Sequence, residues 1–448
     1  MDSFIFFLIS IVISLCFCFT LQAHVLPSSN SNNPFPEEAH PTKSGYLPVA
    51  TTSSSAIFYA LYETQNSTLP LSRTPLLIWL QGGPGTSSMI GNLYEVGPWR
   101  ITESITLEPN PGAWNRFFGV LFLDNPIGTG FSIASSPQEI PTNQEGISKH
   151  LYVAITTFLR LDPVYKHRPI YIVGQSYGGK YASTTGNYIL KRNAQLHASK
   201  RVNLVGVAIG NGIIEAVTQS RTQPANAYYV GLINERQKSE LEKDQLEVVR
   251  LAQIGNWSEA TTAWGRLQGK LQNMSGLATL YDYTRKDHLY HYQDWINQFM
   301  NIAEVKKALG VNESQVFKVS SNDIRAAFRG DIMKSVKFRV EGLLRSNAIR
   351  VLLYQGQYDL IAGPVQTEAW VNTMKWEGIV EYVNAERKIW KVNGELAGYV
   401  QQWKSLTNVV VLGAGHLMPA DQPLNAKAMI EDWVLQKGIF GNSPSFKF

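Results

Sequence analysis

The pentapeptide Gly174-Gln175-Ser176-Tyr177-Gly178 is the stretch of this sequence with the clearest chemical potential. It has the form G-x-S-x-G, and it follows the apolar run 170–173 and precedes a helix-compatible stretch. In this motif a sharp strand-to-helix turn exposes the serine hydroxyl to a base and to a substrate carbonyl. The context therefore favours Ser176 as a nucleophile. An ordinary glycine-rich turn is the alternative.

Partners for such a serine follow it in the chain. Asp359 lies just beyond one apolar run, and His416 lies just beyond another, at the end of a glycine-rich turn. The order Ser, then Asp or Glu, then His is typical of α/β-hydrolases. Asp124 also follows a strand-like run, but it precedes Ser176. The sequence therefore predicts a catalytic triad of Ser176, Asp359 and His416.

A second glycine-rich loop could stabilise the charge that such a reaction develops. Gln81-Gly82-Gly83-Pro84-Gly85 follows the apolar run 75–80. In this fold the oxyanion hole is built from N–H groups of the loop after an earlier strand and of the residue after the nucleophile. We predict that the backbone N–H groups of Gly83 and Tyr177 have this role. A tight Gly-Pro turn that binds nothing is the alternative.

These residues need a rigid framework, and the rest of the chain predicts one. Short apolar or β-branched runs recur along it, each followed by a turn signal, and helical stretches lie between most of them. Continuous apolar runs are typical of parallel strands that are buried on both faces. We therefore predict an α/β-hydrolase fold with a mainly parallel central sheet flanked by helices. The runs are residues 57–62, 75–80, 120–123, 169–173, 204–209, 351–354 and 409–412.

One long region has a different character. It is rich in Gln, Arg, Lys, Trp and Tyr at helical spacing, and it separates two of the predicted core strands. This pattern indicates a helical cap, or lid, inserted into the core. The predicted organisation is a signal peptide at 1–23, a flexible segment at 24–43, a first core segment at 44–213, the cap at 214–336 and a second core segment at 337–448.

The N-terminal segment indicates entry into the secretory pathway. It is apolar and ends in Leu21-Gln22-Ala23, a cleavage-site pattern. It carries Asp2 and no Lys or Arg, so an uncleaved membrane anchor is the alternative. We expect a secreted (extracellular) or vacuolar protein with no stable membrane span once the signal is cleaved. The N-x-S/T sequons predict glycosylation at Asn66, Asn256, Asn273 and Asn312.

Several function classes are disfavoured. The net charge of +5 is spread over a long chain, so we expect no nucleic-acid partner. The only two cysteines, Cys16 and Cys18, lie in the signal segment, so the mature chain has no thiol nucleophile and no cysteine-based metal site. No metal cluster or phosphate-binding loop is present, and we expect no metal and no cofactor. The oligomeric state is not predicted.

Taken in order, the motifs resemble those of the serine carboxypeptidase family, particularly its plant carboxypeptidase-like members. The resemblance covers residues 45–433 and implies that single C-terminal amino acids are released from peptide substrates. It implies that Ser176 attacks, that His416 is the general base and that Asp359 orients His416. Besides the elements above, the motifs that carry it are Ser44-Gly45-Tyr46, Trp79-Leu80, Trp114-Asn115, Leu123 to Ser132, Gly210-Asn211-Gly212 and Leu417-Met418-Pro419.

The resemblance also implies a site for the terminal carboxylate of the substrate. The family commonly has Asn where this chain has Gln81, and Glu where it has Gln175, so that two carboxyl groups share a proton at acidic pH. Because Gln175 is an amide, we expect carboxylate binding with a weaker preference for acid. Thr86 also stands where the family commonly has Cys. The residues implied for this site are Trp79, Gln81, Gly82, Glu95 and Gln175.

Two other functions stay open. Some plant relatives use the same triad to move acyl groups from sugar esters to alcohols, and the altered carboxylate site leaves room for an acyltransferase. The second is a hydrolase-fold protein that binds a partner and has little activity. The intact set of Ser176, Asp359 and His416 argues against this second function.

Overall fold

The computed structural model describes residues 34–67, 69–287 and 291–441. The predicted signal peptide, residues 1–23, and both cysteines lie outside these ranges, as do residues 24–33 of the segment expected to be flexible. Among the described residues, no helix has both the length and the apolar character that a membrane crossing requires.

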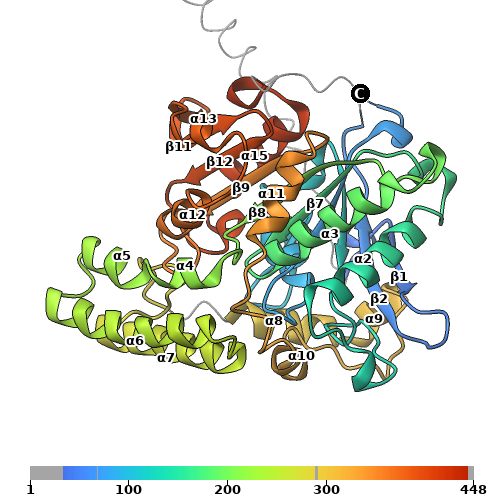
Figure 1. Ribbon diagram of the computed structural model, residues 1–448. Helices are drawn as coiled ribbons and strands as arrows, with labels where there is room; N and C mark the ends of the chain where they lie inside the picture. The colour runs from blue at the N-terminus through green and yellow to red at the C-terminus, as the bar shows by residue number, and fades with distance from the viewer. Residues whose placement is uncertain (1–33, 68, 288–290, 442–448) are drawn as a thin grey trace, which may run out of the picture.

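The described residues form a ten-stranded sheet that runs through the molecule (Figure 1). Its six central strands are parallel, and antiparallel strands extend both edges. This confirms the predicted α/β architecture with a mainly parallel sheet. In sheet order the strands are β1 (Lys43–Pro48), β2 (Ala56–Tyr62), β6 (Gly119–Leu123), β3 (Leu76–Leu80), β7 (Ile170–Gln175), β8 (Leu204–Gly210), β9 (Arg350–Gly356), β12 (Leu406–Val411), β11 (Glu395–Trp403) and β10 (Arg387–Val392).

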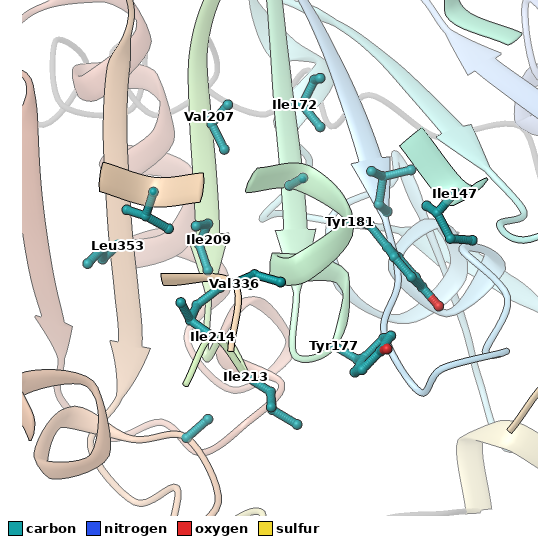
Figure 2. Close-up of a cluster of buried hydrophobic side chains, with 14 of the residues drawn as sticks. Ile147, Ile172, Tyr177, Tyr181, Val207, Ile209, Ile213, Ile214, Val336 and Leu353 are labelled. Atoms are coloured by element: carbon teal, nitrogen blue, oxygen red, sulfur yellow. The ribbon is translucent and has the colours of Figure 1, made fainter. Parts of the chain in front are cut away.

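The continuous apolar runs become central strands because both faces of the sheet are covered. Every residue of β7, β8 and β9 is buried. Alternate side chains enter two hydrophobic clusters, so that Ile172 and Val207 belong to one face and Val173 and Ala208 to the other. Figure 2 shows some of the first cluster, which Tyr181 joins from the helix that follows β7.

Helices cover both faces of the sheet. Leu343 joins the first cluster from one side, while Trp433 packs edge-on against Tyr171 of β7 on the other, with 5.4 Å between ring centroids. The helices on the first face include α2 (Gln144–Phe158), α3 (Gly178–Ala194) and α11 (Lys337–Arg345), and α15 (Pro423–Leu435) covers the second. The remaining helices of the C-terminal region are α12 (Pro364–Val371), α13 (Ile379–Val383) and α14 (Met418–Asp421).

The described residues of the predicted cap, 214–336, form helices, turns and one isolated bridge. Helices α6 and α7 lie side by side at the lower left of Figure 1, and Lys270 links them through Glu240 and Asp244, each at 2.8 Å. The division into core and cap stays a prediction, because α8 packs into the same cluster as the second face of the sheet. The helices are α4 (Ala216–Ser220), α5 (Gln223–Tyr229), α6 (Glu235–Gln253), α7 (Trp257–Ser275), α8 (His291–Met300), α9 (Ala303–Ala308) and α10 (Asn322–Ala327).

The prediction of a flexible segment was wrong for residues 34–43. The 3₁₀-helix η1 (Glu37–Ala39) lies there, and Phe35 is only 3% exposed. The ring of Phe35 packs edge-on against Phe299 of α8 with 5.5 Å between centroids. One aromatic anchor therefore fixes part of the segment that was predicted to be flexible, since burying such a ring stabilises the fold by about 2 kcal/mol.

The loop after β3 is joined to the end of the cap at an isolated antiparallel bridge between Thr86 and Ser320. Thr86 Oγ1 and Ser320 Oγ lie 3.3 Å apart. Ser87 N also donates to the Val319 carbonyl at 2.8 Å. The loop after β3 and the end of the cap are thus joined here by a hydroxyl contact and main-chain hydrogen bonds, at a place where a disulfide could join them instead.

We predict that the double variant Thr86→Cys/Ser320→Cys forms a disulfide. The bridge would close a very long loop and stabilise the fold by about 2–4 kcal/mol, which corresponds to a rise in Tm of roughly 2–5 °C for a chain of this length. Mass spectrometry checks the bond, and calorimetry with and without reductant checks the shift. Each single cysteine variant is the control. Free thiols in the oxidised double variant would contradict the arrangement of these two segments.

Candidate active site

Ser176 lies on the turn between β7 and α3. Its backbone has φ 58°, a left-handed conformation that is uncommon for residues other than glycine. Two close approaches shape this turn. A Cβ on Gly174 would lie 2.0 Å from the Gly178 carbonyl oxygen, and one on Gly178 would lie 2.2 Å from the Leu80 carbonyl oxygen. Both glycines are therefore required, and the turn has the sharpness expected of a nucleophile elbow.

Asp359 and His416 are hydrogen-bonded to each other. His416 Nδ1 lies 2.6 Å from Asp359 Oδ2, and both side chains are buried. An ionised carboxylate only accepts, so Nδ1 is the donor of this bond; in the neutral imidazole, Nε2 then carries the lone pair that a general base needs. His416 and Ser176 line the same cavity, whose volume is about 260 Å³. The structure thus brings the three predicted triad residues to one place, with a base available beside the serine.

Asn211 holds the carboxylate of Asp359 in place. Its Nδ2 donates to Asp359 Oδ2 at 2.7 Å, while Asp359 Oδ1 accepts from Ile361 N at 2.7 Å. Asn211 itself has φ 42°, and its own N–H donates to the Tyr354 carbonyl at 2.8 Å. Sequence reasoning gave Asn211 no role, although a polar residue between two glycines at the end of β8 was the available signal.

Tyr281, from the predicted cap, packs on the imidazole. The two rings are stacked, with centroids 4.4 Å apart and an interplanar angle of 13°. The Tyr281 carbonyl also accepts from His416 N at 2.7 Å. A Cβ on Gly415 would lie 2.4 Å from that same carbonyl oxygen. The cap therefore fixes the plane of the predicted base, and no local pattern in the sequence pointed to this residue.

The predicted oxyanion donors meet beside the serine. A Cβ on Gly82 would lie 2.8 Å from both Ser176 Cβ and Tyr177 N, so the loop after β3 presses directly against the elbow. Gly83 lines the cavity and has φ 107°. Within the described ranges of the chain, the N–H groups of Gly83 and Tyr177 have no hydrogen-bond acceptor. Two donors beside a nucleophile suit a developing oxyanion, and this role stays a prediction.

The side chain of Tyr177 is tied to the end of the cap. Its hydroxyl donates to Asp331 Oδ2 at 2.6 Å, and Gln144 Nε2 donates to the same oxygen at 2.7 Å. Lys180 donates to three main-chain carbonyls within residues 331–334, and burial lowers the pKa of Lys180 to about 8. The segment 331–334 therefore holds the turn that carries the Tyr177 N–H.

The residues implied for the substrate carboxylate form a connected network of side chains. The Trp79 indole, which only donates, bonds to Gln81 Oε1 at 2.8 Å and so fixes the orientation of that amide. Gln81 Nε2 then donates to Gln175 Oε1 at 2.5 Å and to Glu95 Oε1 at 3.3 Å. Gln175 Nε2 donates to Glu95 Oε2 at 2.5 Å. Gln81, Gly82 and Gln175 line the cavity, whereas Trp79 and Glu95 lie buried behind them.

Glu95 is unusual among these groups because it is an acidic residue that is only 1% exposed. Among the described residues, it forms no ion pair. Burial raises the pKa of Glu95 to about 8, although hydrogen bonds from Gln175 and Gln81 oppose the rise. The group is therefore neutral at neutral pH. Glu95 ends the π-helical turn η3 (Gly91–Glu95), where a Cβ on Gly91 would lie 2.2 Å from Trp79 Nε1.

The remaining predicted features are either exposed or untested. The four asparagines of the sequons have exposed side chains, and Thr68, which completes the first sequon, lies outside the described residues. Glycosylation stays a prediction. Among the described residues, no group of His, Cys, Asp and Glu side chains is arranged to hold a metal ion. Asp124 accepts from Ser87 Oγ at 2.5 Å and from Ser88 N at 2.9 Å, so it ties the loop after β6 to the loop after β3, and it is not among the residues that line the cavity.

Comparisons with known proteins give matches over most of the chain. A family model described as "Serine carboxypeptidase" matches residues 33–436. Serine carboxypeptidase-like 50 of Arabidopsis thaliana is 51% identical over 91% of this chain and 90% of its own. Probable serine carboxypeptidase CPVL of Homo sapiens is 32% identical over 90% of this chain and 85% of its own. The crystal structure of Kex1(delta)p, a prohormone-processing carboxypeptidase from Saccharomyces cerevisiae, shares the fold with a TM-score of 0.79. The match covers 89% of this chain and 92% of the Kex1(delta)p chain, with 24% sequence identity.

We predict that Asn211→Ala slows the reaction of Ser176 with a fluorophosphonate by about 10- to 100-fold. The reason is that Asp359 would lose a fixed donor and His416 would lose its alignment with the serine. The measurement is the second-order labelling rate, with the Tm recorded beside it. Asn203→Ala, an exposed asparagine just before the same strand, is the matched control. Labelling of Asn211→Ala at the unmodified rate would refute the role.

Proposed function

The chain belongs to the serine carboxypeptidase family, and from that membership we propose that it hydrolyses the last bond of peptides, releasing single C-terminal amino acids. One observation carries the proposal. The bonded pair Asp359–His416 opens onto the same cavity as Ser176, and that cavity is also lined by Gln81 and Gln175 of the carboxylate network. A nucleophile beside a site for a terminal carboxylate is the arrangement that cleavage at a C-terminus requires.

The proposed reaction follows from the roles of the three residues. Ser176 Oγ attacks the last peptide carbonyl while His416 Nε2 takes its proton, and Asp359 stabilises the resulting imidazolium. The N–H groups of Gly83 and Tyr177 bind the oxyanion. His416 then gives the proton to the leaving amine, and the C-terminal amino acid departs. Water, activated by His416, hydrolyses the acyl-enzyme and restores Ser176.

Recognition of the free C-terminus is assigned to the amide network. A neutral Glu95 behind Gln81 and Gln175 adds no negative charge, so a substrate carboxylate can accept from the cavity-lining amide and main-chain donors. An ionised Glu95 would repel it. Because the pKa of Glu95 is about 8, this proposal extends carboxylate binding to neutral pH. The proposal agrees with the expectation from the sequence that an amide at Gln175 makes substrate binding less dependent on acidic pH.

The proposal includes the route of the protein through the cell. A cleaved signal peptide at 1–23 would bring the chain into the secretory pathway, for an extracellular or vacuolar destination. The exposed side chains at the sequons are accessible to glycan transfer there: Asn66, Asn256, Asn273 and Asn312.

We predict that the purified protein releases free amino acids from N-blocked dipeptides and longer peptides, and that Ser176→Ala abolishes the release. Amino-acid analysis across pH 4–8 measures it. Acyl transfer from a sugar ester to an alcohol, without amino-acid release, would replace the proposal by an acyltransferase. No release together with no fluorophosphonate labelling of Ser176 would leave a binding protein with little activity.

We further predict that KM rises at alkaline pH through Glu95. A carboxyl with a raised pKa is neutral below about 8 and becomes charged above it, so binding of the substrate anion is present below this pH and is lost above it. Between pH 7.5 and 9, KM for free-acid peptides should rise roughly eightfold if only the neutral form binds. The measurement is KM against pH for the unmodified protein and for Glu95→Gln.

Glu95→Gln should keep KM flat over this range, because an amide does not ionise. Peptide amides, which lack the terminal carboxylate, are the substrate control, and their hydrolysis should show no alkaline rise in KM. An unchanged rise in Glu95→Gln would assign the effect to another group and overturn this role for Glu95.

A further inference from the structure

One wall of the catalytic cavity carries a cation that the proposed reaction does not use. Arg325, on α10 of the predicted cap, lines the cavity together with Ser176 and His416. Among the described residues, no carboxylate lies within ion-pair distance of its guanidinium, and no side-chain hydrogen bond holds it. The wall of the cavity that contains Ser176 therefore carries a positive charge without an ion-pair partner in the described ranges.

Neighbouring arginines show what a structural role looks like in this chain. Arg285 is 2.6 Å from Asp421, and Arg329 is 3.7 Å from Glu259. In the cavity, by contrast, the described lining residues include no Asp, Glu or Lys. Nothing on the described cavity wall neutralises Arg325, so the field there favours an anion.

The backbone that carries Arg325 is firmly placed. Ser321 N donates to the Gly85 carbonyl at 2.9 Å, and Ser321 Oγ accepts from Ile324 N at 3.4 Å. Ile324 is fully buried, and a Cβ on Gly85 would lie 2.7 Å from Ile324 Cβ. The residue before Arg325 is thus packed directly against the loop that supplies the predicted oxyanion donor. Arg325 therefore lines the cavity from a rigid base, although the residue itself is exposed to solvent.

We propose that Arg325 selects substrates with an acidic side chain, Asp or Glu, next to the scissile bond. The inference rests on the proposed carboxypeptidase function and names its preferred class of substrate. The terminal carboxylate is assigned to a different element, the network of Gln81 and Gln175 after β3 and in β7. A second carboxylate in the cavity would then meet the unpaired guanidinium, with which it forms a charge-assisted hydrogen bond.

Matched peptides and variants test this directly. Two series of N-blocked peptides are compared. In the first, the residue before the scissile bond is Glu, Gln or Lys, and in the second, the released C-terminal residue is varied in the same way. The measurement is kcat/KM for each peptide. At low salt the unmodified protein should prefer Glu over Gln by about fivefold at one of these two positions, and added 0.5 M NaCl should reduce the ratio. The position that responds identifies which side chain Arg325 contacts.

The variants separate the local contact from a general field. Arg325→Gln should bring the Glu/Gln ratio to about one, and Arg325→Glu should favour Lys instead. Arg329→Gln removes a charge of the same sign four residues further along the chain, outside the cavity lining, and should leave the ratio unchanged. Folding of each variant is checked by its Tm and by fluorophosphonate labelling.

Three results would overturn the inference while leaving the carboxypeptidase function intact. The unmodified protein could release amino acids without preferring Glu at either position. Arg325→Gln could slow all free-acid peptides equally, which would make Arg325 a partner of the terminal carboxylate. Arg329→Gln could lower the ratio as much as Arg325→Gln. Absence of any release by the unmodified protein is the distinct result that overturns the proposed function, and the substrate preference falls with it.

Discussion

The geometry of the site depends on how closely the backbone of Gly82 approaches the turn that carries Ser176. A single added carbon at Gly82 would lie 2.8 Å from the serine Cβ and from the next main-chain nitrogen. This contact sets the loop after β3 against the end of β7, and so brings two N–H donors to the nucleophile. It also places Gln81, the neighbour of Gly82, beside Gln175, the neighbour of Ser176. The nucleophile and the proposed carboxylate site therefore share one backbone junction.

The predicted cap completes the site as well as covering it. Tyr281 stacks on the imidazole of His416, Asp331 holds the Tyr177 hydroxyl, and α10 brings Arg325 to the cavity. Each of these contacts joins segments that are far apart in the chain. With no cysteine in the described residues, buried packing and polar contacts such as the bond from Lys180 to the cap must maintain this arrangement. Displacing the predicted cap would disturb both the proposed base, His416, and the proposed oxyanion donor, Tyr177 N–H.

The sequence predicted the central sheet, which the structure confirms, and it singled out the three residues of the proposed triad, because both have local signatures. Continuous apolar runs mark strands buried on both faces, and Ser176, Asp359 and His416 each follow such a run. The hairpin of β10 and β11 was missed because its side chains are partly exposed and no continuous apolar run marks it. Contacts such as Tyr281 on His416 depend on the tertiary fold, which no local pattern encodes. The near-neutral pKa of Glu95 likewise follows from its burial, which the sequence does not show.

The most direct test of the account is to trap the acyl-enzyme. A depsipeptide, whose last bond is an ester, should acylate the protein faster than water releases it, so that rapid acid quenching preserves the adduct. Mass spectrometry then gives the mass and the position of the adduct. The account predicts one acyl group, equal to the peptide without its last residue, attached to Ser176. No adduct, an adduct on another side chain, or an acyl group that shows cleavage at an internal bond would contradict it.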